Sequence, residues 1–196
     1  MSRRRTSVLA GLGVLTVAFI MRTWVGHTLW VRTEAMVPTV NSHEWIWVMD
    51  RAPELGDVVQ VQLDGASGLY RVAATEGQSL EIRKGRLFVD GVSLDTGVAK
   101  TVSVPDSDCG VEALPATQVN IGTHGFYAVV GGDQPAVVVS PGTIFLLGDN
   151  RPIAGDSRAW GPWPIGSVSG VATRVISSWN ACESRIRWRR TWNSIE

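Results

Sequence analysis

The chain has 196 residues, of which 44% are apolar and 18% are charged. This length is enough for one domain with a real hydrophobic core, and the composition excludes a disordered chain. Basic and acidic residues balance at 18 each, which argues against a dedicated nucleic-acid-binding protein. The two cysteines, Cys109 and Cys182, are too few for a disulfide scaffold or a zinc site. We expect neither a metal nor an organic cofactor.

The balanced charge hides an uneven distribution. Residues 23–182 carry 10 basic and 16 acidic side chains, while four arginines lie in residues 1–22 and four more in residues 183–196. Basic ends around an acidic body indicate a protein that works at a membrane rather than in the cytosol.

An uncharged apolar stretch, residues 8–21, follows the basic residues Arg3, Arg4 and Arg5. Alone it is shorter than the roughly 20 apolar residues that a membrane-spanning helix needs. Apolar residues resume after Arg22 and no small-x-small cleavage pattern follows, so we predict an uncleaved transmembrane anchor over residues 8–30. The alternative is a cleaved signal peptide. The arginines predict that residues 1–7 are cytoplasmic and that the rest of the chain lies on the outer side of the cell membrane.

From residue 45 onward the patterns are those of strands. Short apolar or alternating runs, separated by glycine-containing turns, occur at residues 45–49, 56–63, 69–73, 126–130, 143–147 and 168–176. Residues 79–91 predict a tight hairpin that turns at Lys84 and Gly85. Residues 95–140 predict an irregular insertion with a few short strands. No segment between 35 and 178 requires a helix, so the predicted class is mainly β.

One motif is specific enough to indicate a family. Residues 148–164 read Gly-Asp-Asn-Arg, three residues, Gly-Asp-Ser-Arg, two residues, Gly-Pro-Trp-Pro, which resembles the last signature box of bacterial type I signal peptidases. Residues 31–39 resemble the family's segment ending in Ser-Met-x-Pro-Thr, and residues 56–59 resemble its Gly-Asp-Val-Val box. The resemblance covers about residues 8–178. It implies an antiparallel β domain (residues 31–180) behind an N-terminal transmembrane helix.

The family uses a serine nucleophile, a buried neutral lysine as general base and a second serine that holds the lysine. The corresponding positions here are Ala35, Tyr70 and Ala154. Alanine has no nucleophilic atom, and a phenol with an ordinary pKa of about 10 is a poor general base at neutral pH. A serine hydrolase stripped of its triad retains only about 10³ to 10⁴ over water. Three matched losses therefore predict a non-catalytic member of the family.

The residues around those positions keep the family pattern. We assign to the peptide groove or to the structure of the signature loop Met36, Pro38, Gly148, Asp149, Asn150, Arg151, Asp156, Ser157 and Arg158.

Other residues do not offer a replacement dyad. Lys84 and Lys100, the only lysines, are predicted to be solvated surface charges. Ser42 and His43 are adjacent on an extended segment and so point to opposite faces. Glu34, beside the lost nucleophile, is either a surface charge or a group that binds the N-terminus or a cation of a partner.

The C-terminal residues 181–196 interleave basic and aromatic side chains. They are either a disordered basic tail or an interfacial segment, with Trp188 and Trp192 in the headgroups and arginines on anionic lipid. Whether Cys109 and Cys182 pair stays open.

We therefore predict a membrane-anchored, non-catalytic signal-peptidase-like protein that acts in protein export or surface assembly. Its predicted partners are membrane lipid, exported or leader peptides, and an active signal peptidase or a secretion or assembly complex. The alternative is an active leader peptidase with rearranged residues. A third interpretation is a relative of the conjugative-pilus maturation peptidases.

Overall fold

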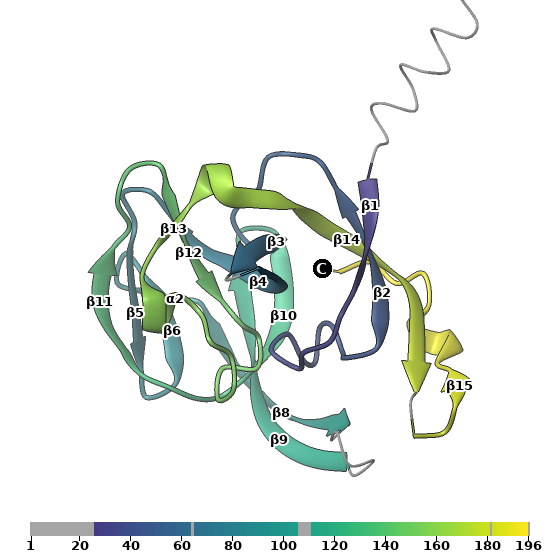
Figure 1. Ribbon diagram of the computed structural model, residues 1–196. Helices are drawn as coiled ribbons and strands as arrows, with labels where there is room; N and C mark the ends of the chain where they lie inside the picture. The colour runs from purple at the N-terminus through teal and green to yellow at the C-terminus, as the bar shows by residue number, and fades with distance from the viewer. Residues whose placement is uncertain (1–25, 64, 106–110, 181, 196) are drawn as a thin grey trace, which may run out of the picture.

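A computed structural model of the chain describes residues 26–63, 65–105, 111–180 and 182–195 (Figure 1). Over these residues the protein is mainly β, and its strand pairs are antiparallel, as the sequence predicts. The hairpin predicted at residues 79–91 is confirmed, with Lys84 and Gly85 as the two residues of its turn.

The largest sheet carries the candidate site. Its strands run in the order β1 (Gly26–Trp30), β2 (Glu44–Met49), β14 (Val168–Asn180), β3 (Val58–Leu63), β4 (Ala66–Thr75), β12 (Thr143–Leu147) and β13 (Trp163–Pro164). The short β15 (Arg185–Ile186) pairs with the far end of β14.

Two smaller sheets complete the described fold. One has the order β10 (His124–Val129), β9 (Val111–Ile121), β8 (Asp95–Pro105), and the other β11 (Gln134–Val138), β5 (Ser79–Arg83), β6 (Arg86–Val89), β7 (Val92–Ser93). The described helices are short: α2 (Ser157–Trp160) and the 3₁₀ turns η1 (Ile165–Ser167) and η2 (Trp188–Arg190).

The two faces of β4 are buried in different parts of the core. Leu69 belongs to a hydrophobic cluster with Met36, Ile46 and other residues of β1, β2 and β14. Tyr70 belongs to a cluster on the opposite face with Ile144 and Leu146 of β12. Because successive side chains of a strand alternate between faces, β4 links the two halves of the core.

The predicted membrane anchor differs from the structure at its C-terminal end. Gly26–Trp30 form β1, which pairs residue for residue with β2, so they are not helical. The small Gly26 lets the Trp47 ring cross the strand, since a Cβ at residue 26 would lie 2.7 Å from that ring. Residues 8–25 of the prediction lie outside the described residues. Among the residues that are described, no helix is both long and apolar enough to cross a membrane.

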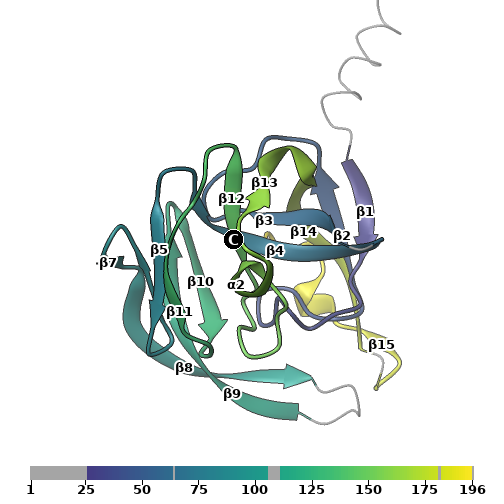
Figure 2. The same cartoon turned by 60° about the vertical axis from the view of Figure 1, so that its left-hand side comes forward.

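The predicted irregular insertion at 95–140 is wrong for most of its length. β8 and β9 are regular eleven-residue strands that form a long hairpin, which projects from the body in both views (Figures 1 and 2). Many β8 side chains are solvent-exposed on both faces, so the sequence lacks the apolar alternation that marks a half-buried strand.

The C-terminal residues are packed rather than free. Residues 192–195 run beside β14, where Val175 N–H donates to Asn193 C=O (2.9 Å) and Ile195 N–H donates to Thr173 C=O (3.0 Å). The Ile195 side chain is buried in the same cluster as Met36. This contradicts the disordered-tail alternative, although Trp188 and Trp192 are 75% and 66% exposed.

A buried carboxylate fixes this segment to the body. Glu44 is fully buried and accepts hydrogen bonds from Asn41 N–H (3.0 Å), Ser178 Oγ (2.7 Å) and Arg190 Nε (2.6 Å). Arg190 also donates to Thr39 C=O (2.9 Å). The guanidinium thus joins the C-terminal segment to the turn that follows residue 35.

We predict that Arg190→Ala destabilises the protein by about 3 kcal/mol, because it leaves the Glu44 carboxylate buried without its cation. The measurement is urea unfolding followed by circular dichroism. Arg189→Ala is the matched control, because that neighbouring side chain is exposed, and it should change stability by less than about 0.5 kcal/mol. Equal effects of the two changes would contradict the role given to Glu44.

Candidate functional site

The structure brings Ala35 and Ala154, at the positions of the family's two serines, together around Gly148. A Cβ placed on Gly148 would lie 2.3 Å from Ala154 Cβ and 2.7 Å from the Ala35 carbonyl oxygen. Ala35 and Ala154 therefore both lie against the face of Gly148 from which a side chain would project. Only glycine fits there, because any side chain would overlap both neighbours.

Asn150 holds the segment that carries Ala35. Its backbone N–H donates to Ala35 C=O (2.9 Å), and its Nδ2 donates to Glu34 C=O (3.1 Å). The side chain is 2% exposed, and its Oδ1 has no hydrogen-bond partner among the described residues. The signature loop thus positions the segment of Glu34 and Ala35 by bonding to its backbone carbonyls.

The second half of the signature loop is organised around Asp156. Its carboxylate accepts from Gly148 N–H (3.0 Å) and forms an ion pair with Arg158 Nε (2.7 Å). It also caps α2, since Oδ1 accepts from Arg158 N–H. Ser157 is buried, and its Oγ accepts from Leu146 N–H (3.0 Å). Through these contacts the three residues hold the second half of the loop against β12.

Tyr70, at the general-base position, is packed among aromatic side chains. Its ring lies edge-on to Trp160 (5.8 Å between centroids), which contacts Trp163 in the same way (5.0 Å). The ring also extends over Gly68, where a Cβ would lie 2.7 Å from it. Burial raises the pKa of the Tyr70 phenol above its ordinary value, and the Asp156 carboxylate raises it further. The phenolate that could act as a general base is therefore even less populated at neutral pH.

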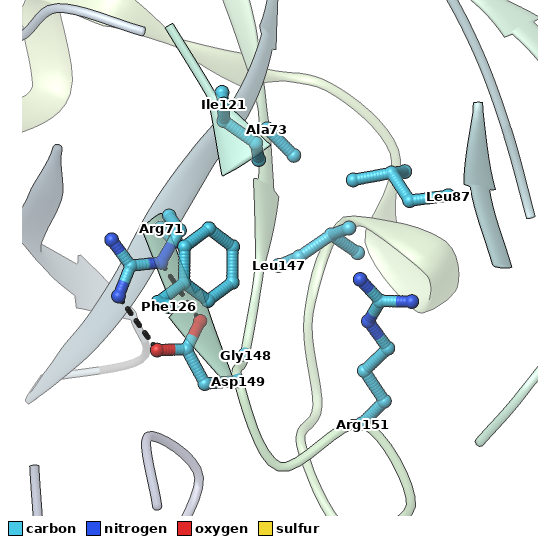
Figure 3. Close-up of a pocket in the computed structure, with 9 residues that line it drawn as sticks. All are labelled: Arg71, Ala73, Leu87, Ile121, Phe126, Leu147, Gly148, Asp149 and Arg151. Atoms are coloured by element: carbon cyan, nitrogen blue, oxygen red, sulfur yellow. Dashed lines mark hydrogen bonds and ion pairs between the residues drawn. The ribbon is translucent and has the colours of Figure 1, made fainter. Parts of the chain in front are cut away.

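A buried ion pair between Arg71 and Asp149 supports the site. Arg71 is 1% exposed and donates from Nε and Nη2 to the two oxygens of Asp149, at 2.9 and 2.7 Å (Figure 3). Its Nη1 donates to Gly56 C=O (2.8 Å), and its guanidinium lies 3.7 Å from the centre of the Phe126 ring. Thr39 Oγ1 donates to Asp149 as well. This network joins β4 and β10 to the turn after Ala35 and to the signature loop.

Arg151 points away from that pair, toward Leu87 and Leu147 (Figure 3). It is 3% exposed, and its single hydrogen bond runs from Nη1 to Gly85 C=O (3.1 Å), so Nε is left without a partner among the described residues. Burial lowers the pKa of its guanidinium below the ordinary value. The adjoining cavity of about 10 Å³ has room for one water molecule.

Sequence reasoning missed Arg71, Thr39 and Glu44 as site-forming residues. Thr39 lies in the motif of residues 31–39, and Arg71 directly follows the general-base position. Neither residue type is reactive there, so only the contacts in the structure show that the two residues form the site. Glu44 had a weak signal, because a carboxylate at the start of an apolar strand requires a partner.

The other residues considered as replacements for the dyad make contacts elsewhere in the fold. His43 packs edge-on against Trp30 (5.7 Å), and Lys84 occupies the β5–β6 turn. Lys100 lies on β8 over the Tyr127 ring (5.1 Å). The Glu34 side chain is half-buried and has no partner among the described residues.

Two further residues were expected in the groove or the loop. Met36 is buried in the core beneath the site, and Pro38 follows a cis peptide bond. Cys182 is disulfide-bonded, while Cys109 lies outside the described residues. In the described part of the chain, no group of three or more His, Cys, Asp or Glu side chains is placed to hold a metal ion.

Comparison with known proteins gives the family. The profile described as "Signal peptidase, peptidase S26" matches residues 4–179, so the chain belongs to the peptidase S26 signal peptidase family. A probable signal peptidase I-1 from Synechocystis is 27% identical over 173 residues, which cover 81% of this chain and 74% of the relative. Thylakoidal processing peptidase 1 from Arabidopsis thaliana is 25% identical and matches 82% of this chain, but only 45% of its own length. The crystal structure of a signal peptidase I from Enterococcus faecalis V583 has a TM-score of 0.40 and 25% identity, covering 62% of this chain and 97% of that one.

We predict that Arg71→Lys costs several times more stability than Arg51→Lys. Both arginines form bidentate pairs, Arg71 with Asp149 and Arg51 with Asp57, but the Arg51 side chain is 38% exposed. Lysine cannot reproduce the two parallel bonds. Breaking a buried pair costs about 3–5 kcal/mol, whereas an exposed pair contributes about 1 kcal/mol or less. Chemical unfolding of both variants tests this, and similar losses would refute it.

We predict that Tyr70→Phe changes how stability depends on pH above pH 10. The folded-state pKa of Tyr70 lies above the unfolded value of about 10. Its contribution is therefore complete below pH 10 and is lost as the pH rises through the folded-state pKa. The unaltered protein should lose stability relative to Tyr70→Phe between pH 10 and 11, measured by urea unfolding. Tyr127→Phe, at the half-exposed second tyrosine, is the control, and parallel curves for the unaltered protein and Tyr70→Phe would contradict the prediction.

Proposed function

We propose that this protein binds exported or leader peptides without cleaving them. The observation that carries the proposal is the site itself. Asn150 Nδ2, Asp156 and Arg71 make their supporting contacts, while alanine methyl groups and a packed phenol stand at the reactive positions. The machinery that positions a peptide is thus retained without a nucleophile or a usable base.

A free strand edge supports peptide binding. β12 pairs with β4 only from Arg71 onward, so no described strand pairs with residues 66–69 on that side. Val72 exchanges backbone hydrogen bonds with Gly56 and Asp57 on the β3 side. The N–H and C=O groups of successive residues point to opposite sides of a strand. Those of Val72 point toward β3, so those of Ser67 and Leu69 point to the free edge. An extended peptide that adds to this edge would run beside Tyr70.

Tyr70 is part of an aromatic cluster that borders the proposed path of the peptide. Tyr70, Trp160 and Trp163 fill the space on the face of β4 opposite Leu69. A bound peptide would therefore present only small side chains toward this cluster. If the aromatic rings close the groove instead, no peptide binds there and the protein acts through other parts of its own surface.

We propose that the chain is a single-pass protein of the cytoplasmic membrane, with its N-terminus cytoplasmic and its β domain outside. The arginines and apolar residues of positions 3–21 support this topology. The outer face of the β1–β2–β14 sheet adds support, because Trp30 lies directly opposite Trp45, and Trp45 and Trp179 are 43% and 38% exposed. Tryptophan is enriched where a protein meets lipid headgroups.

A working peptidase is the second candidate, because relatives of this chain are named as signal peptidases and processing peptidases. It would require a nucleophile from outside the positions that the family uses. The protein could also regulate an active signal peptidase or be part of a secretion or assembly complex. Both roles would use the same peptide groove, so we treat them as forms of the peptide-binding proposal.

The deciding experiment mixes purified full-length protein in detergent with an exported pre-protein and measures cleavage by mass spectrometry. We expect no cleavage by the unaltered protein and activity in the triple variant Ala35→Ser, Tyr70→Lys, Ala154→Ser. Cleavage by the unaltered protein would refute the proposal. No activity in either protein, together with no binding of a labelled leader peptide, would show that the groove is closed.

Ser67→Pro tests whether a peptide pairs with the free edge of β4, because proline removes one N–H that this edge would donate to the peptide. We expect the affinity for a labelled leader peptide to fall by about tenfold, as a lost backbone hydrogen bond and a blocked edge imply. Ser67→Ala removes the hydroxyl but keeps the N–H and is the matched control. If the two variants bind equally, the peptide does not use this edge.

A further inference from the structure

A second cleft lies on the other side of the turn that follows Ala35. It has a volume of about 240 Å³ and is lined by Pro38, Thr39, Lys100, Val102, Gly125, Phe126, Tyr127 and Ser194. These residues come from the turn, the β8–β10 sheet and the C-terminal segment. Ser194 of the C-terminal segment lines the same cleft as Gly125 and Tyr127 of β10, so these two segments lie on its walls. The cleft is thus formed by segments that are distant in sequence and is separate from the edge of β4.

One wall of the cleft is an unpaired strand edge. β10 pairs with β9 on one side, and on the other side its described contact with another segment is the bridge from Val129 to Asn150. Val129 N–H donates to Asp149 C=O (2.8 Å), so its backbone faces away from β9. Residues two and four positions away along a strand point their N–H and C=O groups to the same side. The groups of Tyr127 and Gly125 therefore face the cleft, as those of Val129 face away from β9.

The edge is firmly held. Phe126 is 6% exposed, and its ring lies against the Arg71 guanidinium at 3.7 Å. Arg71 is itself fixed by its two bonds to Asp149. An added strand would therefore meet a preorganised backbone, which reduces the entropy lost on binding.

The charge of the cleft selects for an acidic ligand. Its one lining cation is Lys100, which lies 5.1 Å from the centre of the Tyr127 ring and forms no ion pair with a described residue. No carboxylate is among the lining residues, although the body of the chain is acidic overall. The volume is just below the roughly 300–1,000 Å³ of small-molecule sites, and the open edge favours an extended chain.

We propose that this cleft is a second peptide-binding site, in which an extended segment with an acidic side chain adds to the edge of β10 and pairs its carboxylate with Lys100. The hydrogen bonds to the backbone of Gly125 and Tyr127 supply the register, and the lysine supplies the preference for an acidic residue. The site is independent of the groove beside Tyr70, so it would hold whether or not that groove binds leader peptides.

The test uses full-length protein in detergent and a fluorescent hexapeptide of alternating valine and threonine with one central glutamate. Fluorescence anisotropy should show saturable binding, weakened about twofold to fivefold when glutamine replaces the glutamate, as for a partly exposed ion pair. Methylating alternate backbone nitrogens of the peptide should weaken binding by about tenfold, because it removes hydrogen bonds to the edge.

The chain offers a matched control, because its other lysine lies in the β5–β6 turn. Lys100→Gln should reproduce the loss seen with the glutamine peptide, whereas Lys84→Gln should leave binding unchanged, and so should Ser67→Pro on β4. The proposal is overturned if the glutamate peptide does not bind, or if both lysine variants weaken binding equally. It is also overturned if the methylated peptide binds as well as the parent, or if Ser67→Pro abolishes binding.

Discussion

The ion pair between Arg71 and Asp149 is the interaction on which the rest of the site depends. Two charges that are almost fully buried are stable only when every polar atom around them is satisfied. Here the guanidinium also bonds to Gly56 and rests on Phe126, and the carboxylate also accepts from Thr39. The requirement to satisfy both charges fixes β4, β10 and the signature loop relative to one another. It thereby fixes the positions of Ala35 and Ala154, whatever side chains stand there.

This arrangement explains how the site keeps its shape with alanine at residues 35 and 154. Asn150 holds the backbone carbonyls of Glu34 and Ala35 through its side-chain amide and its own N–H, and the Asp156 carboxylate holds the Gly148 N–H. None of these bonds involves the hydroxyl or amine of a dyad. Replacing those groups therefore leaves the supporting contacts intact. The phenol of Tyr70 then gains its own packing against Trp160, which stabilises the changed site as part of the core.

Parts of the fold could be predicted because their signals are local. The hairpin at 79–91 combines alternation with a Lys84-Gly85 turn, and both residues adopt the positive φ that such a turn requires. The β8–β9 hairpin was missed because most β8 side chains are solvent-exposed and show no apolar alternation, although β9 buries Ala116, Val119 and Ile121. The C-terminal segment was also misjudged, since its order comes from the burial of Ile195 and from the pairing of Arg190 with Glu44, 146 residues away.

The sequence alone determined the family, the mainly β class and the identity of the three replaced residues, because motif spacing and residue type are properties of the chain itself. Only the tertiary structure decided what those replacements mean physically. It brought Ala35 and Ala154 to one face of Gly148, packed Tyr70 against Trp160, and left part of the β4 edge and the outer edge of β10 without a described strand partner. These features depend on contacts between distant segments, and no local pattern encodes which strands will be left without a neighbour.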